Sequence, residues 1–151
     1  MQRRMTILSL AWLVAGLPAA VQAAGTLHCQ IDDEHLHLDV KIPYKKNILD
    51  PGAAVEGTME IRDPRFRGSY PRLRPDSGAV TAFGKTRQNV SVELEFEPAV
   101  RRRKLPTHLE VTAARSKGGY EGSYRLTIGP GIIPEMGQDK TLTYEGRVTC
   151  R

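Results

Sequence analysis

The sequence predicts an all-β fold: a single antiparallel barrel or barrel-like sandwich of eight strands, with the first and last strands adjacent. Apolar and polar residues alternate with a period of two through most of the chain after residue 24, as in strands with one buried face. Cys29 and Cys150 lie near opposite ends of the chain, and a disulfide between them requires neighbouring terminal strands. Closure into a barrel would remove both sheet edges, and a β-sandwich is the alternative.

Residues 1–23 have the pattern of a cleaved secretory signal peptide. Two arginines precede an apolar run over 7–17, and Val21 and Ala23 occupy the positions −3 and −1 relative to a cleavage point before Ala24. The run is about eleven residues, whereas a helix needs roughly 20 to span a bilayer, so no membrane anchor is expected. A lipoprotein signal would place a cysteine at the cleavage point, but the first cysteine is Cys29. We expect residues 24–151 to form one domain in the periplasm or the extracellular space.

Each expected strand follows from a stripe of alternating apolar residues. The strands are expected over 27–31, 36–42, 55–61, 79–85, 90–96, 109–113, 120–128 and 142–150. Three connections, 32–35, 86–89 and 115–119, are short, and four, 43–54, 63–78, 98–106 and 129–139, are long. Both cysteines fall on the apolar face of their strands, so their disulfide should be interior. Glycines at apolar positions, Gly57, Gly122 and Gly146, indicate bends of the sheet.

Two of the long connections concentrate positive charge. Segment 63–78 contains Arg65, Arg67, Arg72 and Arg74, and segment 98–106 contains Arg101, Arg102, Arg103 and Lys104. In a meander, successive connections alternate between the two ends of the sheet. Two strands separate these segments, so both should lie at the same end. The sequence therefore predicts eight cations on one rim of the barrel.

Converging guanidinium groups suit phosphate, carboxylate or sulfate groups. The expected function is an exported, non-enzymatic binding module that engages an anionic envelope polysaccharide, a lipid head group or an acidic protein surface through this rim. The alternatives are a protein-interaction or inhibitor domain that uses the long Pro-rich loops, a carrier of a small apolar ligand and, least expected, a glycan-active enzyme. A solvated charge run without a partner is the competing interpretation. Nucleic acid is not an expected partner of an exported protein.

No catalytic or cofactor motif is present above background. The chain has no nucleophile elbow and no glycine-rich phosphate loop before a helix. His35 and His37 share one face of a strand and could bind a metal weakly, but a solvated face is the expected interpretation. Rows of glutamates could supply an acid–base pair for glycoside hydrolysis, but nothing in the sequence marks a cleft. We therefore expect no enzymatic activity, no cofactor and no metal.

The first testable prediction concerns export. The mature protein should begin at Ala24, because Val21 and Ala23 match the small-residue rule for cleavage. Intact-mass spectrometry of the exported product measures this directly. A soluble exported form that retains residues 1–23 would contradict the prediction.

Overall fold

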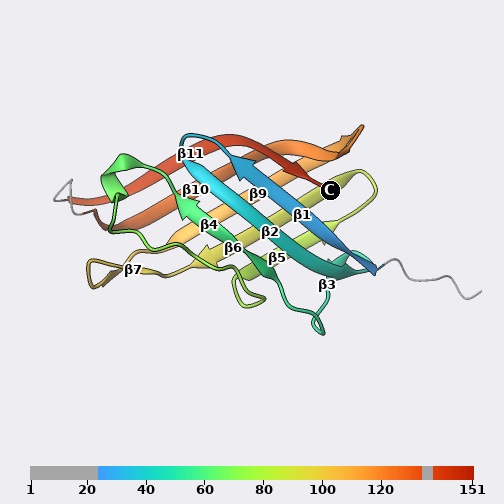
Figure 1. Cartoon of the computed structure of the whole chain (residues 1–151), viewed down its shortest axis with the longest axis horizontal. Coiled ribbons are helices and arrows are strands. Elements are labelled where there is room, and N and C mark those ends of the chain that lie inside the picture. Colours follow the sequence, from blue (N-terminus) through green and yellow to red (C-terminus); the bar gives the residue numbers. More distant parts are fainter. Residues whose placement is uncertain (1–23, 134–137) are drawn as a thin grey trace, which may run out of the picture.

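The computed structural model describes residues 24–133 and 138–151, so the expected signal peptide lies outside the described residues. The described chain folds into a nine-stranded antiparallel sheet that curls into a flattened, nearly closed barrel, and a separate two-stranded hairpin lies in one connection (Figure 1). The predicted fold class is confirmed.

The eight predicted strands are all present, together with three two-residue strands and one short helix in the connections. The long strands are β1 (Ala24–Asp32), β2 (Leu36–Lys45), β4 (Glu56–Ile61), β5 (Val80–Lys85), β6 (Asn89–Phe96), β9 (Thr107–Ser116), β10 (Gly119–Ile133) and β11 (Gln138–Cys150). The short elements are β3 (Ile48–Leu49), β7 (Ala99–Val100), β8 (Arg103–Lys104) and the 3-10 helix η1 (Pro64–Phe66).

The connection expected over 129–139 is shorter than predicted. Strands β10 and β11 continue into it, and their register shifts between Ile128 and Gly131. The sequence Gly129-Pro130-Gly131 interrupts the alternation, which is why the pattern ends there. The backbone absorbs the interruption as a local irregularity of the ladder, as in a β-bulge, and pairing resumes beyond it.

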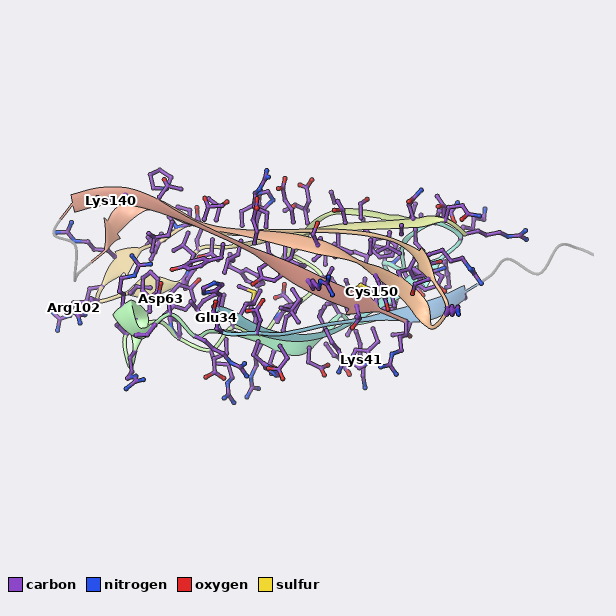
Figure 2. All side chains as sticks on the ribbon, turned by 90° about the horizontal axis from the view of Figure 1, so that it is seen from above. Glu34, Lys41, Asp63, Arg102, Lys140 and Cys150 are labelled. Atoms are coloured by element: carbon purple, nitrogen blue, oxygen red, sulfur yellow. A yellow bond between two sulfur atoms is a disulfide. The ribbon has the colours of Figure 1, made fainter. Side chains whose placement is uncertain are left out.

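The strand order is β3-β2-β1-β11-β10-β9-β6-β5, and β4 pairs with β2 beside β3. The barrel is flattened into two layers (Figure 2). Strands β1, β2 and β4 form one layer, and β6, β9 and β10 form most of the other. Strand β11 crosses between them, from Lys140 in one layer to Cys150 near the other. The fold therefore combines the hydrogen-bonded continuity of a barrel with the layered shape of a sandwich.

The first and last long strands are joined as predicted. Cys29 and Cys150 are direct partners in the β1–β11 register, form a disulfide, and are each 1% exposed. Next to them, His28 and Arg151 exchange two backbone hydrogen bonds of 2.9 Å each. A disulfide of this kind is typical of oxidising compartments outside the cytoplasm. Within the described ranges, no helix has the length and apolar character needed to cross a membrane.

The barrel is not hydrogen-bonded all the way round, because β5 and β4 do not pair. Residues 73–79 bridge part of the gap between β4 and β5. Leu73 exchanges two backbone hydrogen bonds of 2.8 Å with Met59 of β4, and Ala79 accepts one of 2.8 Å from Glu95 of β6. Further along, the Lys85 ammonium lies 4.6 Å from the ring centre of Tyr44, which links β5 to β2 by a cation–π contact.

Alternating side chains fill the interior. The largest fully buried ones are Tyr124, Phe66, Leu27, Ile31, Leu36, Leu38, Ile42, Met59, Leu94, Leu109, Leu126 and Ile128. Gly122 allows a sharp curl of the sheet, because a Cβ there would lie 2.0 Å from the carbonyl oxygen of Thr112. The predicted bend at Gly122 thus has a steric cause: the neighbouring strand approaches too closely for any side chain.

The second prediction concerns the disulfide. Replacing both residues, Cys29→Ala with Cys150→Ala, should lower the free energy of unfolding by about 2–5 kcal/mol, because the link restrains a very long loop of the unfolded chain. Urea unfolding of the double variant and of the oxidised wild type, with equal slopes, measures the difference. An unchanged midpoint would show that the strand pairing alone holds the chain ends together.

Candidate functional site

The two arginine-bearing segments lie at the same end of the barrel, the end that carries η1 and the β7–β8 hairpin (Figure 1). A hydrogen bond between the Tyr70 hydroxyl and Thr107 Oγ1 links segment 63–78 to the first residue of β9, which directly follows segment 98–106. The β1–β2 turn lies at this end as well, where Arg62 Nη1 donates to the carbonyl oxygen of Asp33 at 2.8 Å.

The β7–β8 hairpin presents its cations on an anchored base. Val100 and Leu105 are 4% and 2% exposed, so the hairpin packs onto the core while its tip faces solvent. The two central residues of the turn, Arg101 and Arg102, both have positive φ values, 47° and 67°. Such a two-residue turn normally carries Asn-Gly, and arginine at each position costs on the order of 1 kcal/mol or more. The chain therefore holds two arginines where the backbone disfavours them.

Segment 63–78 is anchored by a buried carboxylate. Asp63 is 7% exposed and accepts hydrogen bonds from the backbone N–H of Arg65 at 2.8 Å and from Arg65 Nη2 at 2.6 Å. The hydroxyl of Tyr144, on β11, donates to the same carboxylate. The Arg65 hydrogen bonds, opposed by burial and aided by Tyr144, lower the pKa of Asp63 to about 2. The same pair raises the pKa of Arg65, so both groups stay charged.

A second tyrosine–aspartate contact holds the β1–β2 turn. Tyr124 donates to Asp33 Oδ2 at 2.6 Å, while Asp33 Oδ1 accepts the backbone N–H groups of His35 and Leu36 at 2.8 and 2.9 Å. Burial works against ionisation of Asp33, but these three hydrogen bonds outweigh it and lower its pKa. Gly146 makes the contact possible, because a Cβ there would lie 2.6 Å from the Tyr124 ring and 2.5 Å from the Asp33 carboxylate. This glycine provides room for the contact and not for a ligand.

The eight predicted cations do not all face the rim. Leu73 pairs with Met59, in the middle of β4, so its neighbours Arg72 and Arg74 lie along the side of the barrel. The parity of the connections predicts the correct end but not this return of the chain along β4. Arg65, Arg67 and the four hairpin cations lie at the end itself.

Three of the eight predicted cations form ion pairs with acidic side chains of the described residues. Arg65 pairs with Asp63 at 2.6 Å, Arg72 with Glu60 at 2.8 Å and Lys104 with Glu97 at 3.7 Å. Among the eight predicted cations, four exposed arginines have no side-chain hydrogen bond or ion pair within residues 24–133 and 138–151: Arg67, Arg74, Arg102 and Arg103. We call these four the unpaired arginines.

Two hollows adjoin segment 63–78 on the outer side of β4. One, of about 500 Å³, is lined by Glu60, Arg62, Phe66, Arg67, Tyr70 and Arg72 among others. The other, of about 490 Å³, is lined by Asp39, Lys41, Glu56, Thr58 and Arg74 among others. The sequence reasoning missed Lys41 and Arg62. Lys41 stands at a polar position of an expected strand, and only the pairing of β4 with β2 brings it to this surface. Arg62 directly follows the expected strand over 55–61 and adjoins segment 63–78 in the sequence.

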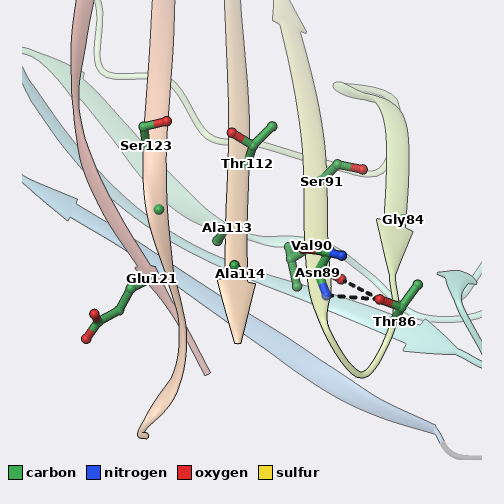
Figure 3. Close-up of a pocket in the computed structure, with 11 residues that line it drawn as sticks. Gly84, Thr86, Asn89, Val90, Ser91, Thr112, Ala113, Ala114, Glu121 and Ser123 are labelled. Atoms are coloured by element: carbon green, nitrogen blue, oxygen red, sulfur yellow. Dashed lines mark hydrogen bonds between the residues drawn. The ribbon is translucent and has the colours of Figure 1, made fainter. Parts of the chain in front are cut away.

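A larger hollow of about 600 Å³ lies elsewhere, on the outer face of β5, β6, β9 and β10 (Figure 3). Glu121 is the charged residue that lines it. Most of the outward-facing lining residues are small: Gly84, Ser91, Thr112, Ala114 and Ser123. It contains none of the predicted site residues and no cation. This hollow and the two beside segment 63–78 are lined mainly by residues on the outside of the barrel.

The histidines form single acidic contacts. His35 lies 3.3 Å from Glu34, and His37 lies 3.3 Å from Asp32. In the part of the chain that the structure describes, no three His, Cys, Asp or Glu side chains are placed to hold a metal ion.

The third prediction concerns Asp63 and acid. Its pKa in the folded protein, about 2, is below that of the unfolded chain, so its stabilising effect is complete above about pH 4 and is lost as the pH falls toward 2. The variant Asp63→Asn should lose about 2 kcal/mol at pH 7 and should depend less on pH between 4 and 2. Thermal unfolding of both proteins at several pH values tests this, and parallel pH profiles would contradict it.

Comparison with known proteins adds no relative: no protein-family model, no curated protein and no solved structure matches this chain.

Proposed function

We propose that the mature protein is an exported, non-enzymatic binding module that engages an anionic partner through the cations at the arginine-rich end. One observation carries this proposal. Buried anchors fix the two arginine-bearing segments, while Arg67, Arg102 and Arg103 keep exposed guanidinium groups without partners in the described chain.

The anchors matter because binding loses less conformational entropy when the loops are already ordered. Phe66 and Asp63 hold one segment, and Val100 and Leu105 hold the other. A merely solvated charge run has no need of such anchors. The positive φ values of Arg101 and Arg102 also support the proposal, because backbone strain persists where the surroundings and function maintain it.

The proposed location of the mature protein is the periplasm or the extracellular space. It is supported by the signal-peptide pattern of residues 1–23 and by the disulfide. Partners with anionic groups in those compartments include acidic polysaccharides, lipid head groups and acidic protein surfaces. Attraction to any of them should weaken as salt is added, because exposed charges are screened beyond about 8 Å at physiological ionic strength.

The fourth prediction separates binding from folding at the hairpin. The double variant Arg101→Asn with Arg102→Gly removes two charges and installs the sequence that the turn geometry prefers. Binding to dextran sulfate at low salt should weaken by about five- to thirtyfold, since each exposed ion pair contributes up to about 1 kcal/mol. The free energy of unfolding should rise by roughly 1 kcal/mol, because positive-φ strain is relieved.

The matched control is Arg87→Ser with Lys117→Ser, which removes the same charge from exposed turns at the opposite end of the barrel. Titration calorimetry measures binding, and urea unfolding measures stability. An equal loss of affinity in both variants would attribute binding to net charge alone and would contradict a site at the arginine-rich end.

A further inference from the structure

The two hollows beside segment 63–78 are consecutive parts of one groove. Glu56 and Thr58 line one hollow and Glu60 lines the other, so the hollows follow each other along β4. On the opposite wall, Arg74 lines the first hollow and Arg72 the second. We call this the β4 groove. From Glu56 to Ile61 it follows about 20 Å of strand, which is long for a single small anion.

Cations are spaced along the β4 groove rather than gathered at one point. Inward-facing Leu73 separates Arg72 and Arg74, which are therefore about 7 Å apart along an extended backbone. Arg67 extends the row at one end, and Lys41 extends it at the other. Figure 2 shows Lys41 on the outer side of the layer that contains β2 and β4. This spacing fits a partner that repeats its anionic group along a chain.

The same groove contains hydrogen-bond acceptors. Asp39, Glu56 and Glu60 line it, and Asp39 is held in place by His28 Nε2 at 2.9 Å and Gln30 Nε2 at 3.0 Å. These carboxylates would repel a partner that carries only anionic acceptors, such as polyphosphate. They would accept hydrogen bonds from a partner that also carries hydroxyl groups. The groove therefore suits a chain with both carboxylates and hydroxyls.

The apolar surface near the groove does not favour membrane insertion. Among the described residues, the one large hydrophobic side chain that is strongly exposed is Ile48, 62% exposed, in β3. Strand β3 lies at the end opposite η1 (Figure 1). Phe66, in the arginine-bearing segment, is buried in the core. Contact at the groove would thus depend on charge and hydrogen bonding, as in recognition of a sugar chain.

We propose that the β4 groove binds a linear acidic polysaccharide of the uronate type, extended along β4. Carboxylates of the chain contact Arg67, Arg72, Arg74 and Lys41, and sugar hydroxyls donate to Asp39, Glu56 and Glu60. This inference rests on the proposed function and names its partner. It extends the contact from the arginine-rich end along the side of the barrel.

The experiment uses the mature protein and oligogalacturonates of defined length, with titration calorimetry at low and physiological salt. Affinity should increase with oligomer length until the groove is spanned and then level off. The variant Arg67→Gln with Arg74→Gln should bind a long oligomer at least tenfold more weakly. The matched variant Arg87→Gln with Lys117→Gln, which removes the same charge from exposed turns at the opposite end of the barrel, should lose less than threefold. Melting temperatures of both variants should stay near that of wild type, since exposed charges add little stability.

A third variant, Glu56→Gln with Glu60→Gln, gives a readout of opposite sign. It should weaken oligogalacturonate binding because two acceptors lose their charge, and it should strengthen polyphosphate binding because repulsion is removed. A parallel loss or gain for both probes would overturn the assigned role of the carboxylates. Equal losses in the Arg67→Gln with Arg74→Gln variant and in its matched control would overturn the groove as the site.

Two further probes separate this inference from the proposed function. Tight binding of anionic phosphatidylglycerol vesicles or of dextran sulfate, without binding of oligogalacturonates, would overturn the uronate assignment and leave an anion-binding module. Absence of binding to every one of these polyanions at low salt would overturn both proposals.

Discussion

The pairing of β1 with β11 is the constraint on which the other features depend. Cys29 faces Cys150 in that register, so the two ends of the chain meet inside the molecule. A sheet whose first and last long strands are neighbours has to curl. Once it curls as a meander, odd-numbered connections gather at one end, which is how segments distant in sequence become a common surface. Closure of the sheet is therefore what brings the charged loops close together in space.

Tyrosines convert that common end into a fixed surface. Three tyrosine hydroxyls link a connection to a strand. Tyr124 and Tyr144 on the strands bond to Asp33 and Asp63 of connections, and Tyr70 of a connection bonds to Thr107 at the start of β9. Burial is the main cause that raises the pKa of Tyr70 and of Tyr144 to about 12, so both remain neutral donors at any physiological pH. Each contact satisfies a polar group that burial would otherwise leave costly. Loops tied down in this way can present cations at low entropic cost.

Most of the fold could be predicted from alternation, because a strand with one buried face shows its period of two directly in the sequence. The disulfide and the shared end of the two arginine-bearing segments then followed from chain order. What alternation missed was the path of the segment between β4 and β5. Prolines at 71 and 75 suggested a loop, and only two backbone hydrogen bonds, at Leu73, define its pairing with β4. The signal was present: Arg72-Leu73-Arg74 alternates outward and inward like a short strand.

The candidate site was harder to predict for a related reason. Charge runs are visible in a sequence, but their partners are not. Glu60 neutralises Arg72 from a neighbouring strand, whereas Arg74, two residues further on, has no partner in the described chain. Mixed charge along the β4 groove lowers the net attraction for polyanions in general. In the proposed binding mode, the same carboxylates accept hydrogen bonds from a hydroxyl-bearing chain and repel a denser anion, so weaker attraction is combined with greater selectivity.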